Sequence, residues 1–341
     1  MKKTFLNLGK QPITNNFLPT DNPSNEYFYD LVVDFDTETK MVSIKNMVDP
    51  PKMFNENYAH RASQSLTMRK HFLDLSKKLK KYKSILEIGS NDGIFIKNFN
   101  KLTSVAVEPC NNFAIETQNM GYETYPNFWT TELAHQIKIK HGKRDLIFAA
   151  NCICHIPDLD DTFKAVEVLL EDNGVFIFED PSLYNIVKNT SYDQIYDEHP
   201  HIFSVIALDN LLRKNGLMVT KVENLTVHGG SNRIYAQKIN SGNSIDKSVE
   251  INKEKERKLG LDKFETFVKF AEKVKNSKTE LVNLLKLLKK KNKKIVSYGA
   301  TYKSTTIFNY CGIGPELIDY IVDTTKAKQG KYSPGMHIPI I

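Results

Sequence analysis

Short apolar runs alternate with amphipathic segments through the middle of the chain. Strands are predicted where the runs are almost unbroken in apolar residues, at 84–89, 104–109, 145–151 and 174–180, with later strands at 217–224 and 233–239. Unbroken apolar runs are typical of parallel strands that helices cover on both faces. The segments between the first runs carry helical patterns, of which 161–170 is the clearest. This alternation predicts an open, doubly wound α/β sheet.

The segments before and after this sheet follow other patterns. Residues 1–57 combine short apolar runs with many Pro, Asn and Asp residues, which indicates short strands and turns in a small irregular domain. Apolar positions recur at helical spacing over 63–83. Beyond a polar linker, the pattern predicts a long charged helix and then a strand, a helix and a strand, at 251–292, 294–299, 302–311 and 317–323. We therefore expect a small amino-terminal domain (1–62), a central sheet domain (63–242) and a carboxy-terminal α/β domain (243–341).

Composition narrows the class of protein further. Of the 341 residues, 40% are hydrophobic and 26% are charged. No apolar run approaches the ~20 residues of a membrane helix, so a soluble protein without a membrane partner is expected. The chain begins without an apolar leader, and its four cysteines form no pair at zinc-ligand spacing, which predicts a reducing, cytoplasmic setting. The net charge of +7 is diffuse, and no aromatic residues interleave with the lysines of 286–294, so no nucleic-acid partner is expected.

The first strand of the predicted sheet ends in a glycine-containing turn, "EIGSNDG" at 87–93. Gly89 and Gly93 allow the backbone to turn sharply and to approach a ligand where a Cβ atom would clash. An acidic residue that binds ribose hydroxyls is expected about 20 residues further on, at the end of the second strand. Glu108 occupies that place. The turn therefore predicts a site for a cofactor that contains a ribose.

The side chain of Asp92 favours S-adenosylmethionine (SAM) over a dinucleotide. Dinucleotide sites usually have the pattern G-x-G-x-x-G, which places a pyrophosphate at the helix amino terminus. This turn reads Gly-Ser-Asn-Asp-Gly, and a carboxylate there repels phosphate but attracts the ammonium and sulfonium groups of SAM. A nicotinamide oxidoreductase, and a plain turn that binds no ligand, stay open as alternatives on these residues alone.

Several stretches, spread in order over nearly the whole chain, resemble the NDP-sugar C-methyltransferases of deoxysugar biosynthesis. They are "LGKQPITNNFL" (8–18), "LEIGSNDG" (86–93), "VEPCNNFA" (107–114), "AANCICHIPDL" (149–159), "IYDEHPHIFS" (195–204), "HGGSNRIY" (228–235) and "DTTKAKQGKYSPGMHIPI" (323–340). Members of that family use SAM to methylate C3 of a nucleotide-linked 4-keto sugar. The resemblance implies a class I SAM-methyltransferase sheet between a small zinc-binding amino-terminal domain and a Rossmann-like carboxy-terminal domain.

The sequence departs from this family in two places. Family members carry two Cys-x-x-Cys pairs near the start. Here the first pair is absent and the second aligns with Asp-Thr-Glu-Thr at 36–39, which cannot bind zinc tetrahedrally. SAM is therefore the expected cofactor, without zinc. Family members also continue beyond the position of Ile341, so the last domain is expected to be abbreviated or to extend further.

The resemblance also implies which residues carry the chemistry. A ketone at C4 acidifies the C3 proton, so the reaction needs a base, donors to the enolate oxygen and a methyl sulfonium in line. In the family a Tyr-x-Glu-His segment lines the sugar site, and it corresponds here to Tyr196, Glu198 and His199. We expect His199 to be the base, Glu198 to orient it or accept its proton, and Tyr196 to donate to the ketone or the C3 substituent. Tyr58 matches a family tyrosine near the same site.

Further candidates are expected to contact the cofactor and the substrate. The cofactor residues belong to the turn and to strand ends: Glu87, Gly89, Asn91, Asp92, Gly93, Glu108, Asn151 and His155. The substrate residues belong to two loops: His228, Gly229, Arg233 and Lys303. A capping or packing role for His155 and a structural role for His228 are equally open. Asp197 and His201 are interpreted as structural.

The expected partner is an NDP-sugar, and the chain is expected to act as a monomer or a homodimer. Two related functions stay open. One is methyl transfer to an oxygen of a related sugar nucleotide. The other is a sugar-nucleotide-binding protein that has lost catalysis along with its zinc.

Overall fold

A computed structural model describes residues 1–21 and 25–341. The chain forms two compact units, which we call the sheet unit (49–182 and 203–258) and the flanking unit (1–48, 183–202 and 259–341). Each unit combines segments that lie far apart in the sequence. The division into three domains at residues 62 and 242 stays a prediction.

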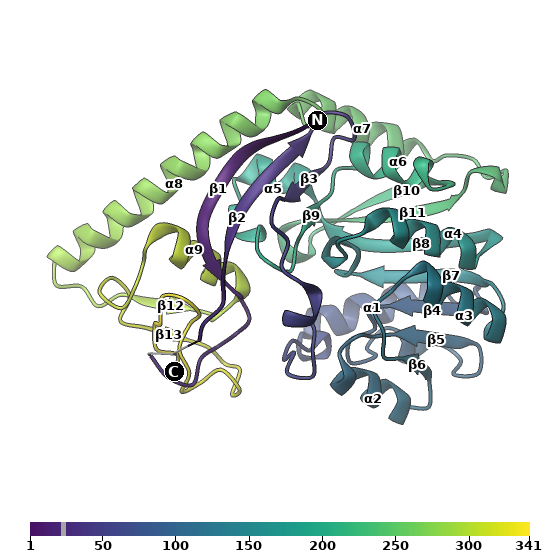
Figure 1. Ribbon diagram of the computed structural model, residues 1–341, viewed down its shortest axis with the longest axis horizontal. Helices are drawn as coiled ribbons and strands as arrows, with labels where there is room; N and C mark the ends of the chain where they lie inside the picture. Colours follow the sequence, from purple (N-terminus) through teal and green to yellow (C-terminus); the bar gives the residue numbers. More distant parts are fainter. Residues whose placement is uncertain (22–24) are drawn as a thin grey trace. The chain divides into compact units, whose positions relative to one another are not determined.

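The sheet unit contains a seven-stranded sheet with the strand order β10-β11-β8-β7-β4-β5-β6 (Figure 1). Its strands are β4 (Ile85–Ile88), β5 (Ser104–Val107), β6 (Glu123–Tyr125), β7 (Arg144–Ala150), β8 (Leu170–Pro181), β10 (Leu217–Leu225) and β11 (Ser231–Lys238). Strands β4 to β8 are parallel, whereas β11 runs antiparallel to both of its neighbours. The predicted doubly wound α/β sheet is confirmed, and the carboxyl ends of its parallel strands meet at one edge.

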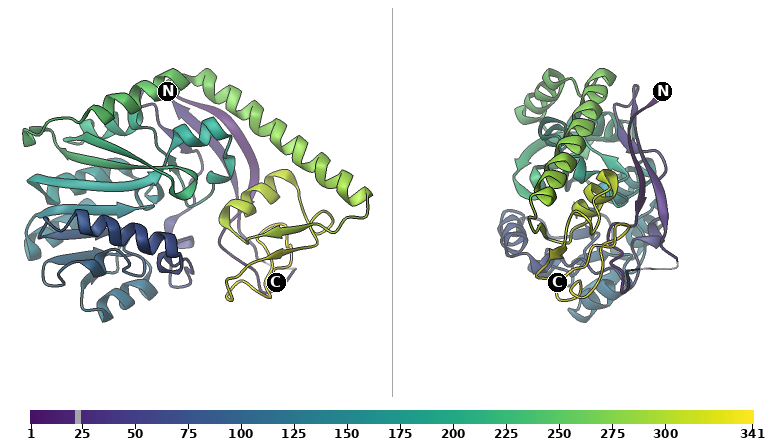
Figure 2. Two further views of the ribbon diagram at one scale, coloured as in Figure 1. Left: turned by 180° about the vertical axis from the view of Figure 1, so that it is seen from behind. Right: turned by 90° about the vertical axis from the view of Figure 1, so that its left-hand side faces the viewer.

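Helices cover both faces of this sheet. They are α1 (Leu66–Lys78), α2 (Asn111–Asn119), α3 (Thr131–His141), α4 (Leu159–Leu169), α6 (Val205–Lys214) and α7 (Lys247–Leu259). Helix α1 lies on one face, and α3 and α4 lie on the other (Figures 1 and 2). Phe72 of α1 packs edge-on against Phe95 and Phe148, at centroid distances of 6.0 and 6.2 Å. This buried contact fixes α1 against the strands that carry the cofactor turn.

The flanking unit contains a four-stranded antiparallel sheet with the order β1-β2-β3-β9, and a short parallel pair, β12-β13. Its elements are β1 (Lys2–Pro12), β2 (Phe28–Asp36), β3 (Val42–Ile44), α5 (Leu183–Asn189), β9 (His201–Ile202), α8 (Phe264–Lys290), β12 (Val296–Tyr298), α9 (Tyr302–Cys311) and β13 (Tyr320–Val322). Phe267 of α8 packs against Phe5 and Phe35, at centroid distances of 5.0 and 4.6 Å. The first two strands are longer than the short strands expected over 1–57, and aromatic packing against α8 stabilises them.

The single helix predicted over 251–292 is wrong. Helices α7 and α8 are separate, and Gly260, just past the end of α7, adopts a left-handed conformation with φ of +83°. A Cβ atom at this position would lie 2.4 Å from Oγ1 of Thr266. A left-handed glycine after the last helical turn is a common way to end a helix. The apolar periodicity on both sides of Gly260 hides this break in the sequence.

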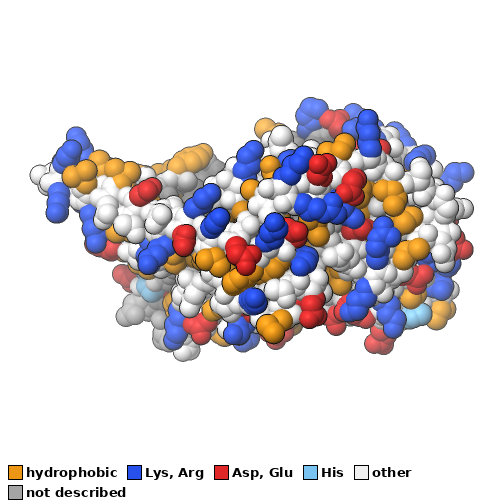
Figure 3. Space-filling model, turned by 90° about the horizontal axis from the view of Figure 1, so that it is seen from above, with side chains coloured by type: hydrophobic (Ala, Val, Ile, Leu, Met, Phe, Trp, Pro, Cys, Tyr) orange, Lys and Arg blue, Asp and Glu red, His pale blue; other side chains and the backbone are white. Residues whose placement is uncertain are grey.

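Short 3₁₀ turns complete the described structure. They are η1 (Pro50–Lys52), η2 (Ala62–Gln64), η3 (Ile96–Asn98), η4 (Ile153–His155), η5 (Tyr192–Gln194), η6 (Val227–Gly229) and η7 (Ile239–Ser241). None of the helices in the described ranges combines the length and the apolar character needed to cross a membrane. On the face drawn in Figure 3, Lys and Arg side chains are interspersed with Asp and Glu, as expected from the diffuse net charge.

Candidate functional site

The turn after β4 has the backbone that its glycines predict. Gly89 and Gly93 have φ of +67° and +69°, and Asn91 between them has φ of +47°. A Cβ atom on Gly89 would lie 2.5 Å from Sγ of Cys152, which follows β7. Glycine is therefore required at position 89 both by its left-handed backbone and by the neighbouring strand end. The turn exposes backbone where a cofactor can approach closely.

Glu108 closes the turn from the end of β5. Its carboxylate accepts the N–H of Asn91 at 2.7 Å and the N–H of Cys110 at 2.9 Å. Burial raises the pKa of Glu108, although these two hydrogen bonds act in the opposite direction. The residue predicted to bind ribose hydroxyls thus also holds the glycine turn in shape.

Buried acidic side chains line this turn. Burial, together with the nearby Glu108 and Asp92, raises the pKa of Glu87 well above its ordinary value. Oδ2 of Asp92 accepts the N–H of Ser63 at 3.2 Å, while its Oδ1 and Oε2 of Glu87 meet no hydrogen-bond donor in the described part of the chain. Buried carboxylate oxygens without donors are costly unless a ligand supplies a donor or a positive charge. These residues therefore fit the cationic amino-acid end of SAM.

A segment before α1 lies over the turn and carries Tyr58. The side chain of Asn91 accepts the N–H of Ala62 at 3.0 Å and donates to the carbonyl of His60 at 2.9 Å. The carbonyl of Tyr58 accepts a hydrogen bond of 3.1 Å from the side chain of Asn112 in α2. The aromatic ring of Tyr58 is buried, with its centroid 5.3 Å from that of Phe54. Tyr58 is thus fixed beside the cofactor turn in the sheet unit.

The residues at the end of β7 lie close to the loop before β11. Asn151 has φ of +48°, and its side chain lies 3.4 Å from Nε2 of His228, which has φ of +53°. Gly229 follows His228 in the 3₁₀ turn η6. The ring of His155 stacks on Phe54, at a centroid distance of 5.4 Å and an interplanar angle of 13°. The structure therefore groups Asn151 with His228 and gives His155 a packing partner.

Arg233 lies inside the sheet, where its charge is compensated. Its Nε is 2.7 Å from Oε1 of Glu179 in β8, and its Nη1 is 2.6 Å from Oε2 of Glu223 in β10. The other oxygen of Glu179 lies 2.7 Å from Nε2 of His71. These contacts favour a structural role for Arg233 over the substrate contact that the sequence suggested. Sequence reasoning missed Glu179 and His71 because neither the strand register that pairs Glu179 with Arg233 nor the packing of α1 that brings His71 to Glu179 is visible in the chain.

Replacing Arg233 with Ala is expected to lower the free energy of unfolding by about 3–5 kcal/mol, because Glu179 would stay buried without its cation. Urea denaturation of the purified protein measures this change. The matched control is Arg257→Ala, which breaks an exposed pair with Glu250 at 2.6 Å. That control is expected to cost less than about 1 kcal/mol. Equal effects of the two changes would contradict a structural role for Arg233.

His199, in the flanking unit, lies at the end of a tight turn, residues 196–199, which we call the histidine turn. Its backbone is closed by a 2.9 Å hydrogen bond from the N–H of His199 to the carbonyl of Tyr196. The Tyr196 hydroxyl lies 2.9 Å from Nε2 of His199, and Nδ1 lies 2.9 Å from the carbonyl of Gln194. A carbonyl only accepts, so Nδ1 donates to Gln194, and the lone pair of Nε2 accepts the hydrogen of the Tyr196 hydroxyl. The geometry therefore holds His199 in the tautomer that a general base requires.

The two residues that follow the histidine turn are held by β3. Ile44 donates its N–H to the carbonyl of Pro200 at 2.8 Å, and the Ser43 hydroxyl lies 3.0 Å from Nδ1 of His201. Glu198, at the third position of the turn, is buried. The structure thus brings Tyr196, Glu198 and His199 together within one turn of the flanking unit.

Lys303 lies in the first turn of α9, directly after the loop that connects β12 to this helix. Thr301 and Ser304 cap this helix reciprocally, with 3.1 Å from the N–H of Ser304 to the Thr301 side chain and 3.0 Å from the N–H of Thr301 to Ser304. Burial lowers the pKa of Lys303, and the nearby Asp193 acts in the opposite direction. The helix amino terminus and a partly buried lysine together form a candidate anion site.

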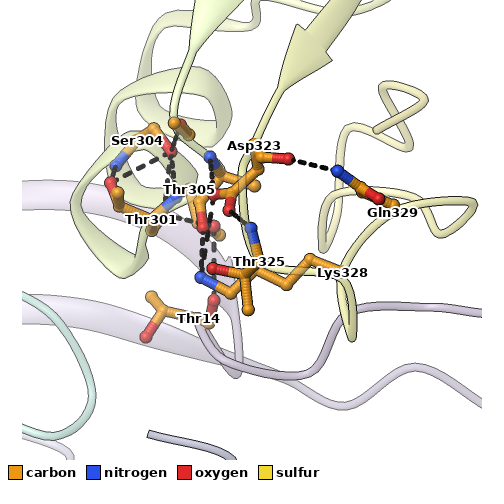
Figure 4. A network of polar contacts seen from close by, with 10 residues as sticks. Thr14, Thr301, Ser304, Thr305, Asp323, Thr325, Lys328 and Gln329 are labelled. Atoms are coloured by element: carbon orange, nitrogen blue, oxygen red, sulfur yellow. Dashed lines mark hydrogen bonds and ion pairs between the residues drawn. The ribbon is translucent and has the colours of Figure 1, made fainter. Parts of the chain in front are cut away.

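A second lysine holds the same loop, as Figure 4 shows. Nζ of Lys328 donates to the carbonyl of Ala300 at 2.7 Å and lies 4.8 Å from the ring centroid of Phe17. The carboxylate of Asp323 accepts the N–H groups of Ala300 and Thr325, each at 2.7 Å. Sequence reasoning did not single out Lys328 or Asp323, although both lie in the matched block 323–340.

One strand, β11, runs antiparallel in an otherwise parallel sheet, and acidic side chains line the turn after β4. Together these two features define the sheet unit as a class I SAM-dependent methyltransferase fold. Family descriptions match the chain in order: "Putative zinc binding domain" over 1–54, "Methyltransferase domain" over 58–222 and "C-methyltransferase C-terminal domain" over 226–341. The chain is similar to the C-methyltransferase NovU of Streptomyces niveus, with 29% identity over 344 residues, which cover 98% of this chain and 82% of NovU. Together these matches extend over nearly the whole chain and support a SAM-dependent C-methyltransferase.

Solved structures with a similar fold are more distant. A SAM-dependent methyltransferase of Anabaena variabilis is 11% identical, with a TM-score of 0.42 over 53% of this chain and 89% of that protein. A methyltransferase of Clostridium acetobutylicum is 15% identical, with a TM-score of 0.38 over 51% of this chain and 92% of that protein.

The stretch that matches a zinc-binding domain does not fit zinc. Residues 1–54 contain neither Cys nor His, which are the ligands of structural zinc sites. At 36–39, the Asp36 carboxylate accepts the N–H of Glu38 at 2.9 Å, and Lys40 donates to the carbonyl of Thr37 at 2.5 Å. These contacts shape the connection from β2 to β3 with side-chain and backbone hydrogen bonds, so no step of the mechanism is assigned to zinc.

Proposed function

We propose that this C-methyltransferase transfers the methyl group of SAM to C3 of a nucleotide-linked 4-keto deoxysugar through an enolate. The observation that carries the proposal is the histidine turn, in which Nδ1 of His199 is held by a carbonyl and Nε2 carries the lone pair. A carbon acid beside a ketone needs a base of this kind. The similarity to NovU, a C-methyltransferase, supports carbon as the methyl acceptor.

His199 is the proposed base, because an imidazole has an unperturbed pKa near neutral pH. It removes the C3 proton, and the electron pair of the broken C–H bond moves into the enolate with its charge on the C4 oxygen. The Tyr196 hydroxyl, 2.9 Å from Nε2, donates to the base in the structure. It is proposed to turn from Nε2 to the ketone or the C3 substituent when the substrate binds, which frees the lone pair of Nε2 for the C3 proton. Glu198 is proposed to orient His199 or to accept its proton.

The turn residues Glu87 to Gly93 and Glu108 are proposed to hold SAM, which supplies an electrophilic methyl group when bound. SAM bound there would supply the methyl group for the new C–C bond to the enolate carbon, and its sulfur would keep the electron pair of the C–S bond. Asp92 and Glu87 are proposed to attract the positive charges of SAM. Tyr58, fixed beside this turn, is proposed to contribute its hydroxyl to the sugar site.

The loop before α9 is proposed to bind the diphosphate of the substrate. Lys303, Lys328 and the helix amino terminus supply positive charge and N–H groups there. His228 and Gly229 are proposed to contact the sugar, whereas the ion pairs of Arg233 speak against a substrate role for that residue. The four free cysteines fit the reducing, cytoplasmic setting that we propose for the reaction.

Incubation with labelled SAM and a panel of NDP-4-keto sugars tests the proposal. We expect a product heavier by one methyl group, with carbon NMR placing that group on C3. Exchange of the C3 proton in D₂O without SAM would show the enolate step separately. A methyl group on oxygen would contradict the carbon acceptor. Tight binding of sugar nucleotides without transfer to any of them would indicate a binding protein instead.

A further inference from the structure

The second position of the histidine turn, Asp197, is anchored away from the base. The carboxylate accepts three hydrogen bonds from Thr14, at 2.6 Å from the hydroxyl to Oδ1 and at 3.2 and 3.3 Å from the N–H to its two oxygens. Asp197 is 1% exposed and Thr14 is completely buried. These bonds join positions 183 residues apart. A long-range buried contact thus holds the corner between Tyr196 and Glu198.

Thr14 is itself held in place by α9. Its carbonyl accepts a hydrogen bond of 3.3 Å from the hydroxyl of Thr305. The next residue of the helix, Thr306, donates to the carbonyl of Ile195 at 3.4 Å. The histidine turn is therefore connected to α9 twice, directly through Ile195 and indirectly through Asp197 and Thr14. All of these residues belong to the flanking unit.

The carboxylate of Asp197 is costly to bury. Its bonding partner Thr14 is neutral, so no cation compensates the charge in this contact. Burial raises the pKa of Asp197 to about 6, although the hydrogen bonds from Thr14 act in the opposite direction. A leucine would avoid this cost but could not accept the N–H and the hydroxyl of Thr14. A buried charge retained beside a base-carrying turn points to a role in the geometry of that turn.

We propose that Asp197 is the positioning residue of His199 and that it acts through Thr14. The N–H of His199, at position four of the turn, bonds to the carbonyl of Tyr196, at position one. The side chains of these two residues stand beside each other only while the two central residues keep their conformation. Anchoring Asp197 to Thr14 fixes the first of those central residues. The Tyr196 hydroxyl and Nε2 then stay at 2.9 Å, and Nδ1 stays on the carbonyl of Gln194. The catalytic part of this inference rests on the proposed function.

Three variants separate the contacts. Thr14→Val keeps the shape and the N–H of residue 14 but removes the hydroxyl. Asp197→Asn keeps the size of the side chain but removes its charge. Thr14→Ser retains both donors and serves as the rescue variant. The matched control is Ser43→Ala, which removes another buried hydrogen bond, 3.0 Å to His201, from the same segment without touching the turn.

The first readout is the tautomer of His199, measured by ¹⁵N NMR of histidine-labelled protein and assigned with His199→Gln. In the unmodified protein and in Thr14→Ser and Ser43→Ala, the spectrum should show a single tautomer protonated on Nδ1. In Thr14→Val and Asp197→Asn, averaging between tautomers is expected. If Asp197→Asn does not fold, the His199 signal of Thr14→Val alone tests the proposal. An unchanged His199 signal in Thr14→Val would overturn the proposal.

The second readout is the reaction itself. Thr14→Val should lower kcat about tenfold with little change in KM, because a small misplacement of the base costs rate rather than binding. Thr14→Ser should restore kcat. If the unmodified protein methylates no NDP-keto sugar, the proposed function fails, yet the tautomer measurement still tests the positioning role. An equal loss of kcat in Ser43→Ala and Thr14→Val would count against the anchor and leave the proposed function standing.

Discussion

Replacing His199 with Ala is expected to lower kcat ~100-fold or more while leaving the affinity for SAM unchanged. A general base contributes about 10²–10⁴-fold to rate, and no other side chain of the histidine turn has an unperturbed pKa near neutral pH. SAM affinity should be unaffected because the proposed SAM contacts lie in the turn after β4, not in the histidine turn. Steady-state kinetics with the methylated sugar as readout, and calorimetric titration with SAM, measure the two quantities.

A second buried histidine provides the control for this prediction. His201 follows two residues later and bonds to Ser43 at 3.0 Å. His201→Asn preserves a hydrogen-bonding side chain and should leave kcat close to that of the unmodified protein. Exchange of the C3 proton in D₂O should be lost in His199→Ala and kept in His201→Asn. Full turnover by His199→Ala would remove this residue from the mechanism.

The sheet was predictable because its strands are buried on both faces. The run at 84–89 contains β4, and the run at 145–151 contains all of β7 but its first residue; the other strands differ from the predicted ranges by only a few residues. Such runs leave little choice of structure once the helical patterns between them are seen. The short strand β6 was not predicted, since Glu123–Tyr125 has neither length nor a continuous apolar character. The sequence therefore predicted the strands that are buried along their length and missed the short, partly exposed one.

The errors at the two ends of the chain have a different origin. Along β1 the buried Leu6 and Leu8 alternate with exposed residues, a weak signal among many polar residues. The break at Gly260 lies within a pattern that stays amphipathic on both sides. Pairing with β2 decides the extent of the first strand, and the left-handed backbone of Gly260 ends the helix. Local sequence carries only part of that information.

In the candidate site, too, the sequence did not predict contacts between residues that lie far apart in the chain. The turn residues Gly89 and Asp92 follow from the chemistry that a cofactor turn requires, and the histidine turn follows from a resemblance. By contrast, the partnership of Asp197 with Thr14 depends on how the chain closes over 183 residues. The ion pair of Arg233 with Glu179 depends on strand register. Sequence reasoning therefore found the groups that a reaction needs, but not the groups that hold them.

Replacing Gly89 with Ala is expected to destabilise the protein by about 3 kcal/mol and to abolish measurable SAM binding. The alanine would have to adopt φ near +67°, and its Cβ atom would lie 2.5 Å from Sγ of Cys152. The backbone of the turn must then shift, and the N–H of Asn91 moves away from Glu108, to which it is joined at 2.7 Å. Urea denaturation and calorimetric titration with SAM measure the two effects.

The control for this prediction separates backbone strain from the clash. Gly312, after α9, has φ of +65° and ψ of +45°, and nothing lies within 4 Å of the position that a Cβ atom would take. Gly312→Ala should therefore show only the strain of a left-handed alanine, about 1–2 kcal/mol, and should bind SAM normally. Adding Cys152→Ala to Gly89→Ala removes the sulfur atom and should recover part of the lost stability. Equal destabilisation by Gly89→Ala and Gly312→Ala, with SAM binding kept in both, would show that the close approach of Cys152 does not constrain the turn.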